Sequence, residues 1–330
     1  MKSLMSRETG GPENLEIVEQ ETPTPNADQV LIRVKAAGVN FPDTLVIRDL
    51  YQYRPERPFA PGSEVAGTVE AVGDKVTNMK VDQRVQALVP HGAFSTHLIA
   101  DARTVSPIPD TMPFDEAAGF IFTYGTTYYA LKDRGHLQAG QSMLVLGAAG
   151  GIGSSAIEIG KAMGAKVIAA VSTEEKAEFC RSIGADETIV YPRDPNRDQQ
   201  KAFSDQVKTL TGGKGVDVVY DVVGGAYAEP ALRAIAWEGY YLVVGFPAGI
   251  PKLPLNLVLL KSCQVAGVFW GAFTQRAPKR HQIFLTELFD LYEAGKLKPR
   301  VTSRYSLEDG AKALVEIETR QAMGKIIIEP

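Results

Sequence analysis

The chain has 330 residues, of which 45% are hydrophobic and 22% are charged, and its formal net charge is −4 at pH 7. This length and composition predict a soluble protein of two globular domains, and the acidic balance without a basic run argues against a nucleic-acid partner. The N-terminal residues lack the apolar segment of a signal peptide. No window approaches the roughly 18 apolar residues of a membrane span, so we expect a cytoplasmic protein with no membrane partner.

Short strands separated by turns are predicted over the first third of the chain. Alternating or β-branched patterns indicate strands at residues 15–19, 29–36, 62–73, 85–88 and 93–99. Glycines inside the third of these suit a strand that bends in a barrel. We therefore predict a small β-barrel, and a cluster of prolines near residue 110 marks its end.

Strands and helices alternate from about residue 124. Apolar strands are predicted at 143–147, 166–171, 187–190, 216–221, 240–245 and 264–269, with helical runs between most of them. This rhythm predicts one doubly wound parallel sheet, an α/β architecture. Further elements are predicted at 281–294 (helix), 301–305 (strand), 307–319 (helix) and 325–328 (strand). Periodicity does not decide whether this last part packs on the sheet or returns to the first domain.

A glycine-rich segment follows the strand at 143–147 and precedes a helical run. It reads GAAGGIGS at residues 147–154. Such a turn binds a pyrophosphate, because glycines let the backbone approach the phosphates and the helix N-terminus presents unpaired N–H groups. The strand at 166–171 completes the βαβ unit that the motif requires. The segment therefore predicts a dinucleotide-binding site.

The end of the strand at 166–171 distinguishes between cofactors. Units that bind NAD place a carboxylate about 20 residues beyond the glycines, where it binds the ribose 2′-hydroxyl. This chain has Ser172 at that place, and no carboxylate stands there to repel a 2′-phosphate. Ser172 and Thr173 can donate hydrogen bonds and Lys176 adds positive charge, so we predict NADPH. A polar turn followed by a solvated lysine is the alternative, since Glu174 and Glu175 are close.

Cysteine and histidine positions predict that the protein holds no metal. Cys180 and Cys263 lie in separate elements, and neither belongs to a C-x-x-C pair, so neither a disulfide framework nor a structural zinc site is expected. His91 and His97 flank one loop, but no third ligand accompanies them.

Further motifs are spread along the whole chain. They are GVNFPDT at 38–44, PGSEVAG at 61–67, TYGTTYYAL at 123–131, GAD at 184–186, DVVGG at 221–225, VGF at 244–246 and GVFWG at 267–271. With the glycine-rich segment they resemble the medium-chain dehydrogenase/reductase superfamily, above all its zinc-free quinone oxidoreductase branch, which includes zeta-crystallin. The resemblance implies a GroES-like β-barrel catalytic domain at 1–123 and 272–330, and a Rossmann NADPH-binding domain at 124–271.

A homodimer is also implied by the resemblance. The apolar strand around residues 265–268 would lie at the edge of the Rossmann sheet, where it can pair across a two-fold axis.

The departure from zinc alcohol dehydrogenases bears on the chemistry. Where those enzymes hold catalytic zinc with a cysteine and a histidine, this chain has Asn40 and Ser63, and near the third ligand it has Phe122. Alcohol oxidation without a Lewis acid is disfavoured, whereas electron-poor quinones, enones and enals accept hydride without a metal. The resemblance therefore implies a zinc-independent, NADPH-dependent quinone reductase. The alternatives are an enone, enal or enoyl-thioester reductase and, in another class, an NADPH-binding structural or RNA-binding protein.

The resemblance carries cofactor-binding residues onto this chain one at a time. From the pyrophosphate turn through the 2′-phosphate to the nicotinamide they are Ala149, Gly150, Gly151, Ile152, Ser172, Lys176, Tyr191, Thr126, Gly245, Phe246, Phe269, Trp270, Gly271 and, in a C-terminal pattern, Lys325. Two alternatives remain open: Tyr191 as a half-buried tyrosine at a strand end, and the other aromatic residues as ordinary core.

Two residues are predicted to act on the acceptor. In the resembling family, an asparagine at the place of Asn40 and a tyrosine at that of Tyr51 face the cleft where the acceptor lies. Hydride transfer builds negative charge on the acceptor oxygen, so hydrogen-bond donors there stabilise the transition state. Alternatively, Asn40 binds the nicotinamide ribose or fixes a loop, and Tyr51 is a surface residue. Leu45 stands where some relatives have a second tyrosine, which makes the pocket more apolar on that side.

No general acid is assigned from the sequence. Water or a ribose hydroxyl is expected to relay the proton that completes the reduction.

Overall fold

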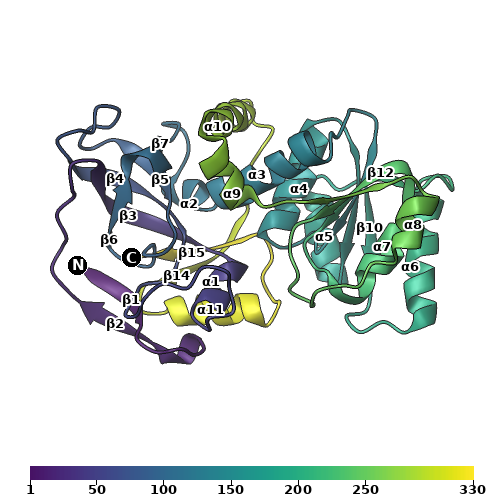
Figure 1. Cartoon of the computed structure of the whole chain (residues 1–330), viewed down its shortest axis with the longest axis horizontal. Coiled ribbons are helices and arrows are strands. Elements are labelled where there is room, and N and C mark those ends of the chain that lie inside the picture. Colours follow the sequence, from purple (N-terminus) through teal and green to yellow (C-terminus); the bar gives the residue numbers. More distant parts are fainter. The chain divides into compact units, whose positions relative to one another are not determined.

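The computed structural model describes all 330 residues, which form two compact units. One unit comprises residues 1–122 and 299–330, and the other comprises residues 123–298 (Figure 1). The first is built mainly of antiparallel strands and the second holds a six-stranded parallel Rossmann sheet, as the sequence predicts. No helix combines the length and the apolar character that crossing a membrane requires.

The first unit is built on a seven-stranded sheet in the order β14-β15-β3-β4-β5-β7, with β6 paired to β3. Its pairs are antiparallel except β14 with β15. The strands are β3 (Gln29–Val39), β4 (Glu64–Val72), β5 (Arg84–Leu88), β6 (His97–Asp101), β7 (Val105–Pro107), β14 (Val301–Ser306) and β15 (Lys325–Glu329). A separate hairpin pairs β1 (Lys2–Ser6) with β2 (Leu15–Glu19).

Short helices connect or cover these strands. They are α1 (Phe41–Val46), α2 (Phe114–Ala118) and α11 (Gly310–Glu318), with 3₁₀ turns η1 (Pro12–Asn14) and η2 (Ala102–Thr104). Helix α2 packs against β3 and β4, and α11 packs against α1. The core between them is apolar; Val30, Ile32 and Leu314 are among its fully enclosed residues.

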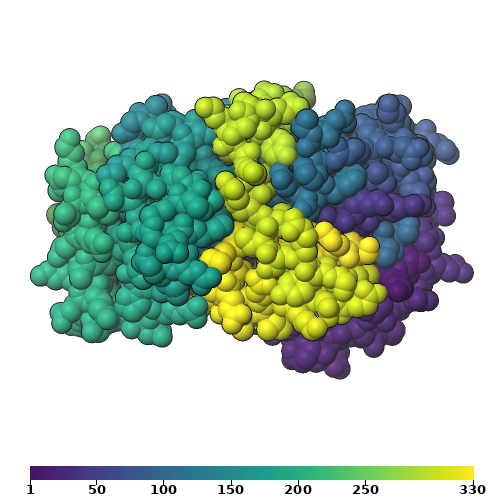
Figure 2. Space-filling view, turned by 180° about the vertical axis from the view of Figure 1, so that it is seen from behind, coloured from purple at the N-terminus to yellow at the C-terminus, as the bar shows by residue number.

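The C-terminal segment belongs to the first unit, which answers the question left open by periodicity. Strand β15 pairs with β3, so that Ile326 lies opposite Val39 and Ile328 lies opposite Ala37. Figure 2 shows the yellow C-terminal residues lying against the purple N-terminal ones. Because Ile326 and Ile328 are buried in the core of the first unit, the last strand is part of that core.

The second unit has six parallel strands in the order β10-β9-β8-β11-β12-β13. They are β8 (Ser142–Leu146), β9 (Lys166–Val171), β10 (Glu187–Val190), β11 (Val216–Asp221), β12 (Ile235–Val243) and β13 (Gln264–Gly267). The apolar runs at 143–146 and 167–171 are buried throughout, because helices cover both faces of a parallel sheet. Strand order reverses between β8 and β11, which is where such sheets bind ligands.

Helices of the second unit alternate with its strands (Figure 1). They are α3 (Ile121–Tyr128), continued by a π-helical turn at Tyr129–Arg134, then α4 (Gly151–Ala162), α5 (Glu174–Ser182), α6 (Arg197–Leu210), the 3₁₀ turn η4 (Gly225–Tyr227), α7 (Ala228–Arg233), α8 (Leu255–Leu260), α9 (Trp270–Arg276) and α10 (Pro278–Glu293).

The division between units differs from the one that the sequence predicts. We expected residues 272–330 to join the catalytic domain, but only residues from 299 onward do so. Helices α9 and α10 stay with the second unit, because the Phe273 ring stacks on Tyr129 and the Phe284 ring packs edge-on against Tyr128.

Strand β12 begins five residues before the predicted strand at 240–245. Glu238 adopts a left-handed φ of 60°, and the pairing of β11 with β12 shifts register between Val216 and Val218. This irregularity interrupts the apolar pattern and hides the first half of the strand from periodicity.

Candidate functional site

The glycine-rich turn joins β8 to α4 and is shaped by its glycines. Gly147 has a φ of +68°, a conformation that favours glycine. A Cβ on Gly153 would lie 2.3 Å from the Gly147 carbonyl oxygen, so no larger residue fits there. Helix α4 begins after Gly150, and no side chain caps its first N–H groups. This geometry fits a pyrophosphate, since uncapped N–H groups and the helix dipole attract anions.

Predicted cofactor residues lie where the parallel strands end. Ser172 follows β9, Tyr191 follows β10, Phe246 follows β12 and Phe269 follows β13. Because carboxyl ends of parallel strands meet at one edge of a sheet, these residues share the edge that holds the glycine-rich turn.

Asp221 stabilises the loop after β11 at the same edge. Its carboxylate accepts hydrogen bonds from the backbone N–H groups of Val223 and Gly224, both at 2.8 Å, and from the Tyr241 hydroxyl at 2.5 Å. Burial raises the pKa of the Asp221 carboxyl, and these donors lower it in part. Because its hydrogen bonds all stay within the fold, Asp221 orders the loop.

The place predicted for the 2′-phosphate holds two basic residues. Lys176 is half-buried on α5, and its pKa is lowered first by burial and then by the nearby charge of Arg193. Thr173 caps α5, because its hydroxyl oxygen accepts the Lys176 backbone N–H at 3.3 Å. Arg193 is not among the residues predicted from the sequence. The available signal was its position two residues after Tyr191, at the same sheet edge.

Tyr191 is only 8% exposed and belongs to an aromatic cluster. Its ring centroid lies 4.3 Å from that of Tyr227 and 5.8 Å from that of Phe203. The Tyr227 hydroxyl donates a hydrogen bond to the Pro192 carbonyl at 2.8 Å. These contacts match the alternative of a strand-end tyrosine packed in the core, while its part in cofactor binding stays a prediction.

Residues predicted near the nicotinamide differ in exposure. Phe269 is 64% exposed, whereas Trp270 is 4% exposed. The indole of Trp270 packs so closely on α3 that a Cβ on Gly125 would lie 2.6 Å from it. Thr126, next to that glycine, is also buried. The structure thus brings Thr126 and Trp270 into neighbouring positions inside the second unit.

Asn40 lies at the junction of β3 and α1 in the first unit. It is the N-cap residue of α1, and its backbone N–H donates to the Asp43 carboxylate at 2.7 Å. Its side-chain Nδ2 donates to Glu64 Oε1 at 2.9 Å, and its Oδ1 accepts from Lys325 Nζ at 2.7 Å. Only 4% of Asn40 is exposed. These bonds agree with the alternative that Asn40 fixes local structure, and its contact with a substrate stays a prediction.

Lys325 and Glu64 form an ion pair inside this cluster. The Lys325 ammonium also donates to Glu64 Oε1, and the second carboxylate oxygen of Glu64 accepts the Phe122 backbone N–H at 3.0 Å. Lys325 is 4% exposed and Glu64 is fully buried. The structure therefore brings together Asn40 and Lys325, which the sequence predicted for different roles. Glu64 was not predicted; a carboxylate at an inward position of β4 was the signal for it.

Tyr51 follows α1 and is half-buried against the core of the first unit. No group in the structure forms a hydrogen bond with its hydroxyl. Burial, and after it the charge of Asp43, raises the pKa of Tyr51. Burial also raises the pKa of Asp43 to about 7. Tyr51 is thus a protonated phenol with an unused donor beside the Asn40 cluster.

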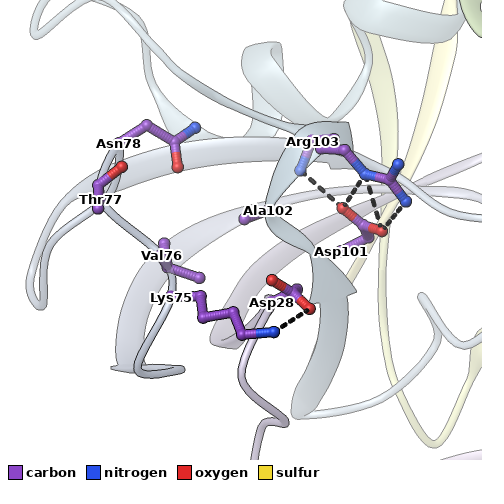
Figure 3. A pocket seen from close by; sticks show the side chains of 8 residues that line it. All are labelled: Asp28, Lys75, Val76, Thr77, Asn78, Asp101, Ala102 and Arg103. Carbon is purple, nitrogen blue, oxygen red and sulfur yellow. Dashed lines mark hydrogen bonds and ion pairs between the residues drawn. The ribbon is translucent and has the colours of Figure 1, made fainter.

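A separate surface hollow of about 470 Å³ lies on the first unit (Figure 3). It is lined by Asp28, Lys75, Val76, Thr77, Asn78, Asp101, Ala102 and Arg103. Its charged side chains pair with one another, Lys75 with Asp28 at 3.9 Å and Arg103 with Asp101 at 2.5 Å. It shares no residue with the predicted site, and its charges are already balanced.

Comparison with known proteins agrees with the resemblance seen in the sequence. Residues 26–110 match the family model of alcohol dehydrogenase GroES-like domains, and residues 151–285 match that of zinc-binding dehydrogenases. A quinone oxidoreductase from Pseudomonas aeruginosa is 36% identical over 326 residues, which cover 97% of each chain. The chain belongs to the quinone oxidoreductase branch of the medium-chain dehydrogenase/reductase superfamily.

Solved structures of quinone oxidoreductases share the whole fold. The Escherichia coli quinone oxidoreductase complexed with NADPH has a TM-score of 0.91 and 30% identity, and covers 100% of both chains. A mycobacterial protein complexed with NADPH has a TM-score of 0.92 and 33% identity, and the match also covers 100% of both chains.

Zinc has no ligand set in this oxidoreductase, although one matching family model is named for it. No group of three or more His, Cys, Asp or Glu side chains is arranged to hold a metal ion. Asn40 and Ser63 stand where zinc alcohol dehydrogenases are expected to have zinc ligands. The side chain of Asn40 forms a hydrogen bond with Lys325, and the Ser63 hydroxyl is buried without a hydrogen-bond partner. A buried ammonium beside Asn40 would repel a cation.

Proposed function

We propose that the protein is an NADPH-dependent oxidoreductase that transfers hydride to quinones without zinc. One observation carries the choice of NADPH: at the sheet edge that holds the glycine-rich turn, the position of the NAD-specific carboxylate is Ser172, with Lys176 and Arg193 nearby. Membership of the quinone oxidoreductase branch supports quinones as acceptors. The NADPH complexes of two structural relatives support the choice of cofactor.

Binding residues of the second unit have separable roles under this proposal. The N–H groups at the start of α4 would bind the pyrophosphate, and Lys176 and Arg193 would neutralise the 2′-phosphate. Thr126 and the residues after β12 and β13, among them Phe246 and Phe269, would border the nicotinamide. When bound, NADPH supplies the hydride.

Tyr51 would act on the acceptor from the first unit. As hydride arrives, negative charge develops on the acceptor oxygen, and the unpaired Tyr51 hydroxyl is able to donate a hydrogen bond to it. The proton that completes the reduction would come from water or a ribose hydroxyl, because no titratable side chain forms a hydrogen bond with the Tyr51 hydroxyl. Asn40 would contribute a second donor, and Leu45 would give an apolar surface suited to a quinone ring.

The proposed function is tested by following NADPH oxidation with a panel of quinones, enones and enals, with NADH and EDTA as controls. Quinone turnover that prefers NADPH and is insensitive to EDTA is the expected result. Turnover confined to enones or enals would make the protein a reductase of that class. NADPH binding without turnover on any acceptor would contradict the enzymatic proposal and favour a structural role.

We further infer that the protein is a homodimer paired through β13. This strand is at the edge of the six-stranded sheet, and its residues Gln264, Val265 and Gly267 are exposed. Unpaired edges of this kind are ordinarily covered. The expected mass in light scattering is twice that of the chain, and Val265→Lys should shift it to one chain. A monomeric wild-type protein at micromolar concentration would contradict the inference.

A further inference from the structure

The enclosed cluster of Asn40, Glu64 and Lys325 has a feature that a simple ion pair lacks. The two charged groups contact each other directly, and the Asn40 amide forms a hydrogen bond with each of them. Lys325 Nζ donates to Oδ1 at 2.7 Å, and Nδ2 donates to Glu64 Oε1 at 2.9 Å. If the amide turned by half a rotation, its NH₂ would face the ammonium and its oxygen would face the carboxylate. Both contacts would then be repulsive, so the two charges permit one orientation of the Asn40 side chain.

The backbone around the cluster holds the two charged groups in place. A Cβ on Gly38 would lie 2.4 Å from Glu64 Oε1, and a Cβ on Gly119 would lie 2.7 Å from Lys325 Cγ. These glycines make room for the ion pair, and the Phe122 N–H binds the other oxygen of the carboxylate. Because Ile326 pairs with Val39, the strand register brings Lys325 next to Asn40.

The ion pair also changes the donor strength of the amide. An ammonium on Oδ1 draws electron density from the amide nitrogen, and hydrogen bonds in such a chain strengthen one another where the surroundings are dry. Nδ2 carries two hydrogens. Nδ2 donates to Glu64 at 2.9 Å, and its only other recorded contact with an acceptor is a long one, to the Gly38 carbonyl at 3.5 Å. One polarised N–H of Asn40 therefore retains most of its capacity to donate.

We propose that Lys325 and Glu64 are positioning residues that act through Asn40, orienting and polarising its amide so that its remaining N–H donates to the acceptor. This deepens the proposed function and rests on it. It gives Lys325 a different role from the cofactor contact implied by the resemblance, since its ammonium is enclosed with Asn40 and Glu64.

A double-mutant cycle tests whether the pair acts through Asn40. The variant K325M/E64Q removes both charges together and so avoids leaving one charge buried alone. We expect it to lower kcat by about 10- to 100-fold, less than the roughly 100- to 1,000-fold typical for loss of a whole oxyanion donor, because the amide itself remains. The Kd for NADPH should be unchanged. In an Asn40→Ala background the same pair should change kcat by less than about twofold, because the residue through which it acts is already absent. Additive losses would overturn the proposal.

A matched control separates positioning from stability. Arg48 and Glu318 also form an ion pair in the first unit, beside α1 but not touching Asn40. Arg48→Met with Glu318→Gln should leave kcat within about twofold of wild type at a comparable change in thermal stability. If this variant lowers kcat as much as K325M/E64Q does, the effect is structural and the proposal fails. If K325M/E64Q does not fold, Lys325→Arg replaces it in the cycle. The proposal then requires that Lys325→Arg lowers kcat in the wild-type background and leaves kcat unchanged in the folded Asn40→Ala background.

A spectroscopic readout keeps the inference testable if no acceptor is turned over. In ¹⁵N-labelled protein, the two Asn40 Nδ2 protons should resonate far apart, because one bonds to a carboxylate, and should exchange slowly with water. K325M/E64Q should bring the resonances together and speed exchange, and the Arg48/Glu318 control should change neither. Averaged, fast-exchanging Asn40 protons in the wild type would overturn the inference independently of the proposed function.

Discussion

The two units hold their charged groups in contrasting ways. In the second unit, the start of α4 is uncapped and the basic residues Lys176 and Arg193 are near one another at a sheet edge. In the first unit, Glu64 and Lys325 are enclosed and satisfy each other and Asn40. The first arrangement suits binding of an anion from outside, whereas the second suits fixing the geometry of a neighbour. The charges of the two units should therefore respond differently when they are removed.

The largest effect is expected from breaking the enclosed pair on one side. Lys325→Met leaves Glu64 buried without its cation, which typically destabilises a fold by about 3–5 kcal/mol. Denaturant unfolding should show this loss, and adding Glu64→Gln should restore most of it. The exposed pair of Arg304 with Asp115 is the control, since Arg304→Met should change stability by less than about 1 kcal/mol. Equal losses of unfolding free energy in Lys325→Met and Arg304→Met would contradict this expectation.

A second effect concerns the pH dependence of stability. Burial raises the pKa of Asp43 from 3.8 to about 7. The charge of Lys325 lowers this pKa and that of Glu64 raises it, and Tyr51 is the other titratable group near Asp43. Between these values the unfolded chain has released the proton that the folded chain keeps, so stability falls as pH rises from about 4 to 7. The loss is on the order of 4 kcal/mol. The stability of Asp43→Asn, measured by denaturant unfolding across this pH window, should lack this fall. If the stability of the variant and of the wild type changes with pH in parallel, Asp43 is not the group responsible.

A third effect concerns the basic residues Lys176 and Arg193 at the sheet edge. Removing Lys176 and Arg193 together should weaken NADPH binding about 10- to 100-fold, because two charge-assisted contacts to a phosphate are lost. NADH binding should be nearly unchanged, since it has no 2′-phosphate. Fluorescence titration measures both. Lys161→Ala is the control, because that lysine is bound to Asp186 at 2.7 Å. Equal weakening of NADH and NADPH would place the two residues elsewhere than at the 2′-phosphate.

The smallest effect is expected at Tyr51. Tyr51→Phe removes one neutral donor and should lower kcat/KM for quinones about 3- to 10-fold. Tyr53 provides the comparison, because its hydroxyl already bonds to His91 Nδ1 at 2.8 Å. Tyr53→Phe should therefore leave kcat/KM within about twofold of wild type. Full activity of Tyr51→Phe on every acceptor would remove its role as a donor.

The same contrast explains what could be predicted from the sequence. The glycine-rich turn and the strands at 166–171, 187–190 and 216–221 follow local patterns, and each of these strands has the predicted bounds. The Asn40 cluster joins residues 24 and 285 positions apart, so no local pattern announces it. The register of β15 on β3 brings Lys325 next to Asn40, and register depends on tertiary packing.

One experiment tests most directly whether the two units divide binding and chemistry between them. The NADPH Kd and the quinone kcat are measured for wild type, for K176A/R193A and for K325M/E64Q. We predict that K176A/R193A raises the Kd for NADPH and retains kcat at saturating NADPH, and that K325M/E64Q lowers kcat and retains the Kd. A rise in Kd for K325M/E64Q would contradict this prediction, because Lys325 would then serve the cofactor.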